Sequence, residues 1–390
     1  MTWGLSQKFK VAKGFKMRGR IDRQQAMFVT LDVEALVPAD HPLRAIKRMA
    51  DGELARLQRR FNDAYARIGR PSIPPEQMIK AMLLQALYSI RSERQLCEQI
   101  GYNFLFRWFL DLSPEAAAWN HSTFTKNRER FAEHGLLQRF FEGTVAHAIE
   151  VEAAGSEHFS VDGTLIQAWG SMKSFRPKDD PDDPDDGAGR GEANRWVDFH
   201  GEKRSNETHQ SRTDPEARLM RKGRGQAAIL AHSMHALMDN RHGLLLDVAL
   251  TEANGTAERD AAEAMIRRVQ RRHALHPKTL GADKGYDDGD FLHRLERELN
   301  VKPHVAIRNG AIKSHDQNAR ARRRARKRAQ TKTYQMSQRS RRRIEEIFGW
   351  MKQIGGMTKA RFVGRWKIQL QAWATGASYN LMRLAKQAEG

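Results

Sequence analysis

Between residues 155 and 307 the chain changes repeatedly between segments with the pattern of a strand and segments with the period of a helix. The first strand-like segment is followed by two more, at 228–238 and 244–250, on either side of a polar turn. A helical segment, a strand at 279–283, a second helical segment and a strand at 301–307 complete the series. Three strands in succession and then alternating helices and strands predict an α/β fold with a mixed sheet.

This order of elements matches an RNase H-like sheet, in which the first strand lies beside the fourth. Asp162 lies on the first strand of the series, and Asp283 ends the fourth. We therefore expect these two carboxylates to lie side by side. Asp287 and Asp288 follow the same strand and are alternatives to Asp283, although we expect them to begin the next helix. Pro303 predicts an edge position for the last strand, because proline cannot donate a backbone hydrogen bond.

The geometry of a later helix selects a third carboxylate. Its apolar face consists of Ile344, Ile347, Phe348 and Met351. At about 100° per residue, Glu346 points about 150° away from that face, whereas Glu345 lies about 110° away, at its boundary. Arg341 and Lys352 lie on the same side of the helix as Glu345. This arrangement favours a cleft position for Glu345, and an ordinary ion pair with Arg341 is the alternative.

The chain is strongly basic, with 67 Lys and Arg against 47 Asp and Glu and a net charge of +20. Such a charge predicts a polyanionic partner, and the phosphate backbone of DNA is the usual one. We expect no membrane partner, because no apolar run is long enough to span a bilayer and no signal-peptide core follows the basic start. Cys97 is the single cysteine, which excludes a disulfide within the chain and a cysteine-based zinc site.

Composition divides the chain into a basic N-terminal arm (1–40), a helical DNA-binding domain (41–150) and a domain that contains the sheet (155–385). The short helices of the second part resemble helix-turn-helix DNA readers, and a helical bundle with solvated cations is the alternative. An acidic segment near 176–215 predicts a disordered loop, and the segment near 312–343 predicts a basic arm that contacts phosphates. The cations expected at DNA are Arg94, Arg107, Lys284, Arg322, Arg323, Arg324, Arg341 and Lys352.

Over residues 40 to 380 the chain resembles the DDE transposases of bacterial insertion sequences, in particular the insertion-sequence-five family. The acidic motifs that carry the resemblance are Ser160-Val161-Asp162-Gly163-Thr164, Gly281-Ala282-Asp283-Lys284-Gly285-Tyr286-Asp287 and Arg341-x3-Glu345-x6-Lys352. The stretch 70–123 looks like the family's helical N-terminal domain. The chain departs from the family at Gln338, where tyrosine is usual, and this puts a hydroxyl contact to DNA and the full activity of this copy in doubt.

Cleavage of a phosphodiester needs an activated nucleophile, a stabilised leaving oxygen and neutralised phosphate charge, which two Mg²⁺ ions supply. Mg²⁺ prefers oxygen ligands, so we expect Asp162, Asp283 and Glu345 to hold the ions, with Mn²⁺ as a substitute. The resemblance implies that the protein cleaves the inverted-repeat ends of its element and joins the 3′-hydroxyl to target DNA. It also implies a homodimer or higher oligomer on DNA, in the bacterial cytoplasm at the nucleoid.

Two alternatives to this function remain open. The first is an RNase H-like nuclease that cuts without strand transfer, and the second is an inactive copy that only binds DNA. Hydrolysis at a histidine-rich metal site is more distant, because the 15 histidines are scattered and no His-Glu-x-x-His spacing occurs.

Overall fold

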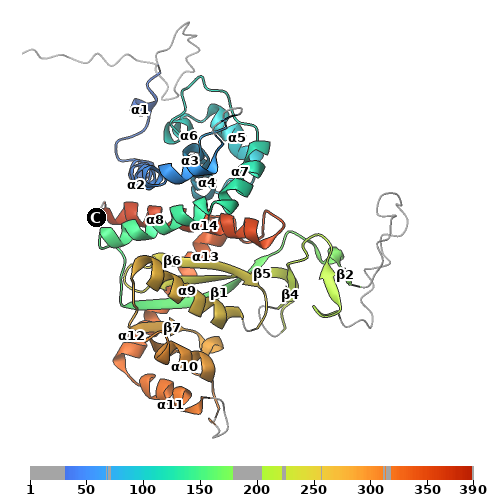
Figure 1. The fold of residues 1–390 in the computed structure, drawn as a ribbon, viewed down its shortest axis with the longest axis vertical. Coiled ribbons are helices and arrows are strands. Elements are labelled where there is room, and N and C mark those ends of the chain that lie inside the picture. The colour runs from blue at the N-terminus through green and yellow to red at the C-terminus, as the bar shows by residue number, and fades with distance from the viewer. Residues whose placement is uncertain are drawn as a thin grey trace, which may run out of the picture.

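The structure is a computed structural model that describes residues 31–66, 68, 72–178, 204–221, 225–255, 257–310, 312 and 318–388 (Figure 1). Most of the arm expected at 1–40 lies outside these residues. The expected order of a helical region and then a mixed sheet with helices is confirmed. The helices before the first strand are α1 Val33–Leu36, α2 Pro42–Arg56, α3 Gln58–Ala64, α4 Pro75–Leu87, α5 Glu93–Tyr102, α6 Phe104–Phe109, α7 Ser122–Glu133 and α8 Leu136–Glu150. Among the helices of all the described residues, none has the length and apolar character needed to cross a membrane.

The main sheet is built around its first strand. Its strands are β1 His158–Gln167, β4 Arg218–Met220, β5 Ile229–Asp239, β6 Leu245–Glu252, β7 Thr279–Ala282 and β8 Lys302–Val305. β1 pairs antiparallel with β5 on one side and parallel with β7 on the other, and β8 continues the sheet parallel to β7. β6 pairs antiparallel with β5. The five longer strands therefore follow the order β6, β5, β1, β7, β8, as the RNase H-like sheet predicts, and Pro303 lies in the edge strand β8.

Two helices connect the strands of the second half of the sheet. α9 (Ala257–His273) leads from β6 to β7, and α10 (Gly289–Arg297) leads from β7 to β8. The apolar stripe of α9 is buried, and it consists of Ala262, Met265, Ile266 and Val269. α9 packs on β5 and β6, so its first turn is held next to the sheet.

The segment predicted as an acidic loop near 176–215 is described only at its ends, because residues 179–203 lie outside the described part. These ends pair as a small antiparallel sheet of β2 (Phe175–Pro177) and β3 (His209–Ser211). The ring of His209 stacks on Phe175 with 5.4 Å between centroids. Strands of three residues are too short to show a period in sequence, which is why the pattern did not predict them.

The basic segment near 312–343, expected as an arm, contains the helices α11 (Ala319–Arg328) and α12 (Lys332–Arg341). Ala321 and Ala325 are buried, which gives α11 a narrow apolar face. On its flank, Arg324 and Arg328 each lie 2.5 Å from a carboxylate oxygen of Glu296 in α10. The small alanines allow α11 to pack closely on α10, while the charges of Arg324 and Arg328 are paired with Glu296.

The helix α14 (Arg365–Ala388) connects the two parts of the molecule, after α13 (Arg343–Gln353). α14 contacts α2, α4 and α8 on one side and β6 on the other, and Figure 1 shows it running between the helical region and the sheet. Residues of both parts belong to the same hydrophobic core.

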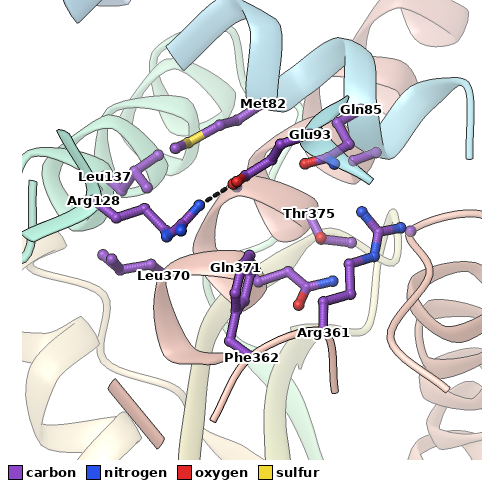
Figure 2. Close-up of a pocket in the computed structure, with 13 residues that line it drawn as sticks. Met82, Gln85, Glu93, Arg128, Leu137, Arg361, Phe362, Leu370, Gln371 and Thr375 are labelled. Atoms are coloured by element: carbon purple, nitrogen blue, oxygen red, sulfur yellow. Dashed lines mark hydrogen bonds and ion pairs between the residues drawn. The ribbon is translucent and has the colours of Figure 1, made fainter. Parts of the chain in front are cut away.

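A polar junction lies beside this core (Figure 2). Arg128 of α7 forms an ion pair with Glu93 of α5, and its guanidinium carbon lies 4.4 Å from the centroid of the Phe362 ring. Phe362 precedes α14, so this stacking joins the helical region to the C-terminal segment. Arg361 and Gln371 line the same pocket.

Candidate active site

Asp162 and Asp283 lie at the junction of the two parallel strands β1 and β7. The ladder between these strands pairs Ser160 with Gly281, and each aspartate follows its ladder residue by two positions. Burial raises the pKa of Asp162, and the negative charge of Asp283 raises it further, as expected for neighbouring carboxylates. The structure thus brings together the two carboxylates that the strand order predicts to be adjacent.

The carboxyl group of Asp162 is largely removed from water. Burial, and then the charges of Asp283 and Glu258, raise its pKa to about 6, against the opposing effects of Gly163 N–H and Arg341. Oδ1 accepts a hydrogen bond from Gly163 N at 2.8 Å, and Oδ2 accepts one from Arg341 Nη1 at 3.0 Å. Arg341 is therefore the cation that balances this carboxylate in the structure.

Asp283 caps the short 3₁₀ helix η2 (Lys284–Tyr286), because its Oδ1 accepts a hydrogen bond from Gly285 N at 2.7 Å. The two alternatives to Asp283 have other partners. Asp287 is buried and accepts from Arg308 N at 2.9 Å. Asp288 caps α10 by accepting from Phe291 N at 3.1 Å, so it begins the next helix as expected.

Helix α13 has the buried face expected from the sequence, formed by Ile344, Ile347, Phe348 and Met351. Glu345 lies in its first turn and is exposed. Lys352 donates from Nζ to Thr164 Oγ1 of β1 at 2.6 Å, so this helix contacts the strand that carries Asp162. Glu346 lies 3.9 Å from Arg383 of α14. Within the described ranges, no three His, Cys, Asp or Glu side chains are close enough together to hold a metal ion as they stand.

Sequence reasoning missed Glu258, in the first turn of α9. Oε1 of Glu258 lies 3.2 Å from the position that a Cβ at Gly163 would occupy. Oε2 lies 3.5 Å from the corresponding position at Gly285. The sequence signal was the polar cap before the helix: Asn254 Oδ1 accepts from Ala257 N at 2.6 Å. That cap predicts where α9 begins but not which strand its first turn faces.

Two buried polar side chains lie around these carboxylates. Tyr286 is fully buried, and burial and then the charges of Glu258, Asp162 and Asp283 raise its pKa well above the usual value. His235 is also fully buried, and burial lowers its pKa to about 4, so the ring is neutral at pH 7. The Tyr286 hydroxyl and His235 Nδ1 have no hydrogen-bond partner among the described residues.

The cations expected at DNA divide into exposed and paired groups. Arg94, Lys284 and Arg323 are exposed. Arg322 lies 3.5 Å from Asp287, and Arg324 is paired with Glu296.

The expectation for Arg107 is wrong. It is 2% exposed, and its guanidinium donates to the backbone carbonyls of Ile100, Gly101, Ser113 and Ala116. A buried guanidinium with these acceptors stabilises the turn around α6 and cannot reach a phosphate.

Gln338, which stands where the family usually has tyrosine, contacts the ends of two strands. Its Nε2 donates to Ala282 O of β7 at 3.2 Å and also to His304 O of β8. Ala282 immediately precedes Asp283, so Gln338 supports the backbone that carries the second acidic motif.

Comparison with known proteins gives two family matches, a transposase domain (DUF772) over residues 31–130 and a transposase DDE domain over residues 154–381. No curated protein matches the chain. Among solved structures, the piggyBac transposase synaptic complex with hairpin DNA is 10% identical, with a TM-score of 0.38 over 90% of this chain and 76% of that chain. The Mos1 transposase paired-end complex with left transposon end is 12% identical, with a TM-score of 0.20 over 76% of this chain and 82% of that chain.

Proposed function

This chain belongs to the DDE family of transposases, and we propose that it cleaves the inverted-repeat ends of an insertion sequence and joins the 3′-hydroxyl to target DNA. The observation that carries the proposal is the placement of Asp162 beside Asp283 by the parallel pairing of β1 and β7. Two cations from the segment that contains Glu345 reach the same strand, since Arg341 contacts Asp162 and Lys352 contacts Thr164.

The residues at this position fit divalent cations. Carboxylate oxygens are the ligands that Mg²⁺ and Mn²⁺ prefer. The charges of Asp283 and Glu258 disfavour ionisation of Asp162, so positive charge brought between them would relieve the repulsion. We propose that Asp162, Asp283 and Glu345 hold two Mg²⁺ ions, which Mn²⁺ can replace. When bound, such ions activate the attacking hydroxyl and neutralise charge on the phosphate.

Helix geometry supports Glu345 as the third ligand. Lys352 lies seven residues after Glu345 in α13, which places both on one side of the helix. The hydrogen bond from Lys352 Nζ to Thr164 Oγ1 directs this side of α13 toward β1. Glu346 is directed instead toward Arg383. Since Glu345 is exposed, a carboxylate there is accessible to substrate DNA from the solvent side.

We propose a separate role for the cations around the acidic residues. Arg341 and Lys352 would hold phosphate oxygens near the cut, because their side chains reach β1 from α12 and α13. Lys284 is exposed directly after Asp283 and can contact the DNA backbone there. The helical region and α11 would supply further contacts to the phosphates, and two or more copies would bring the ends of the element together.

The test compares Asp162→Asn, Asp283→Asn and Glu345→Gln with Glu346→Gln, which removes the same charge from the same turn of α13. Each of the first three variants should lose strand cleavage in Mg²⁺ while still binding a DNA end, and Glu346→Gln should cleave like the wild-type protein. Cleavage retained in the Asp283 variant, or equal losses in both glutamate variants, would contradict the assignment.

Strand transfer separates the proposal from its two alternatives. With a pre-cleaved end that carries a 3′-hydroxyl, the wild-type protein should join that end to a plasmid target. A nuclease would cut intact ends but leave the pre-cleaved end unjoined. An inactive copy would bind the end and do neither.

A further inference from the structure

Helix α9 begins beside the acidic ends of β1 and β7. Its first turn contains two acidic residues, Glu258 and Asp260, that differ in direction. The side chain of Asp260 is 76% exposed and lies 3.9 Å from Arg294. Glu258 is half-buried and is directed toward the strand that carries Asp162. Only the first of the two carboxylates is therefore turned into the active site.

The two oxygens of Glu258 lie over the two acidic motifs. Oε1 is close to Gly163, the residue after Asp162, and Oε2 is close to Gly285, two residues after Asp283. A Cβ at Gly285 would also lie only 2.9 Å from Asp283 Oδ1. The absence of side chains at these two glycines therefore leaves the space in which the carboxylate of Glu258 approaches Asp283 and the strand that carries Asp162.

This position is electrostatically unfavourable for a carboxylate. Burial, and then the charge of Asp283, raise the pKa of Glu258, while Arg259 opposes the shift. Arg259 itself lies 3.4 Å from Asp288. Among the described side chains, none forms a hydrogen bond or ion pair with Glu258, and Arg341 is paired with Asp162. A half-buried carboxylate without a paired cation is costly, unless a positive ligand compensates its charge.

Independent evidence for a ligand comes from neutral side chains. The hydroxyl of Tyr286 is fully buried without a hydrogen-bond partner in the described part of the chain, and the charges of all three carboxylates act on it. His235 Nδ1 also lacks a partner there, and it lies 3.1 Å from the Cβ position at Gly163, on the same side as Glu258 Oε1. Buried polar atoms of this kind are normally satisfied, and a hydrated cation would supply the missing partners.

We propose that Glu258 is a further cation-binding carboxylate of this active site, which binds a divalent metal ion together with Asp162 and Asp283 when the three side chains draw closer together than they stand in this structure. This inference rests on the proposed function, because it concerns the same site. Glu258 lies in the first turn of α9, so the proposed ligand comes from a part of the chain outside the three acidic motifs.

The test measures Mn²⁺ binding to the full-length protein without DNA by calorimetry, so that the readout does not depend on cleavage. Glu258→Gln should weaken Mn²⁺ binding at least ten-fold, as should Asp162→Asn. Asp260→Asn is the matched control, since it removes one charge from the same helical turn, and its affinity should stay within two-fold of the wild-type value. Melting curves of the metal-free variants establish that each is folded.

The outcomes separate the inference from the proposed function. If Glu258→Gln binds Mn²⁺ as tightly as the wild type while Asp162→Asn does not, the inference is wrong and the proposed function stands. Equal weakening by Glu258→Gln and Asp260→Asn also overturns the inference, because it would reflect net charge alone. Unchanged binding in both the Glu258 and Asp162 variants would overturn the inference and the proposed function together.

Discussion

The carboxylate of Asp162 lies in a buried position near the negative charges of Asp283 and Glu258. Its pKa rises from the ordinary value of 3.8 to about 6 because the group is buried next to Asp283 and Glu258, although Arg341 is paired with it. Ionisation is thus less favourable in the folded chain than in the unfolded chain. A bound divalent cation would reverse this preference, and metal binding should therefore weaken as the pH falls below about 6.

Asp162→Asn should stabilise the metal-free protein at pH 8 and leave its stability nearly unchanged at pH 3, below the pKa of the carboxyl in either state. A raised pKa in the folded state contributes nothing unfavourable while the carboxyl is protonated in both states. The unfavourable contribution grows between pH 3.8 and about 6 and is complete above that range. Removal of the charge should therefore raise the free energy of unfolding at pH 8 by on the order of 2 kcal/mol. Urea titrations at both pH values check this, and equal effects at both would contradict it.

Some single residues could not be placed from sequence because their surroundings come from distant elements. Arg107 looks like any basic residue of a short helix, and only the end of α5 and the turn after α6 together supply the carbonyls that bury it. Gln338 departs from a family pattern, and its contacts with Ala282 and His304 depend on how α12 lies on the sheet. Glu258 faces β1 because α9 packs on the sheet.

Among the elements, the turn between β5 and β6 depends on one carboxylate. Asp239 is fully buried, and its Oδ1 accepts hydrogen bonds from the N–H groups of Gly155, Arg241 and His242, while Oδ2 accepts from Leu244 N. The sequence predicts a turn at these residues, but the contact with Gly155 requires the segment before β1 to lie alongside. A carboxylate with four such donors stabilises the hairpin far more than turn propensity alone.

Asp239→Ala should lower the free energy of unfolding by about 3 kcal/mol, because buried N–H groups lose a charged acceptor. Asp239→Asn retains one acceptor oxygen and should recover part of the loss. Chemical denaturation of both variants measures the difference. An alanine variant as stable as the wild type would show that water replaces the carboxylate.

The basic helix α11 has two kinds of arginine. Arg324 and Arg328 are paired with Glu296, whereas Arg320, Arg323 and Lys327 are exposed. The exposed cations recur at spacings of three and four residues, so they form one stripe on the helix surface. The sequence predicted the charge of this segment correctly, but only packing against α10 determines which side chains remain available for DNA.

Replacement of Arg320, Arg323 and Lys327 together by alanine should reduce the salt dependence of DNA binding. If all three contact phosphates, the slope of log K against log salt should decrease in magnitude by about 3 × 0.9. A variant with Arg324 and Arg328 replaced is the control, because these side chains neutralise Glu296 and should affect stability more than the slope. Equal slopes for the triple variant and the wild type would exclude α11 from the interface.

Elements with a long apolar period or a strong turn were predictable, and the ones that depend on pairing were not. β1, β5 to β8, α9 and α13 follow their apolar patterns, and the adjacency of Asp162 and Asp283 follows from the strand order. β2, β3 and β4 are three residues long and exist only because of their partners. The exposure of Glu345 likewise depends on which other elements cover α13, and the apolar pattern of α13 alone does not indicate them.

At the scale of the whole molecule, α14 joins regions that the composition separates. It packs on α2, α4 and α8 and also on β6, with buried residues along most of its length. The helical region and the sheet therefore share a core, so their stabilities are coupled through one element.

The full-length protein should unfold in one calorimetric transition, because loss of α14 removes apolar cover from both parts simultaneously. A chain truncated before Arg365 should lose near-UV circular dichroism from both regions, although the truncation removes no strand of the sheet. Two well-separated transitions in the full chain, or a truncated chain with an intact helical region, would show that the shared helix does not couple them.

The position of α14 in the chain also affects synthesis. The ribosome makes α2, α4, α8 and β6 before the helix that covers them, so their apolar faces remain without this partner while the chain is still attached. Nascent chains should consequently need protection from aggregation until α14 emerges. Products of interrupted translation that lack α14 would be degraded or insoluble, and cutting activity would become available only after the segment up to residue 388 has been completed.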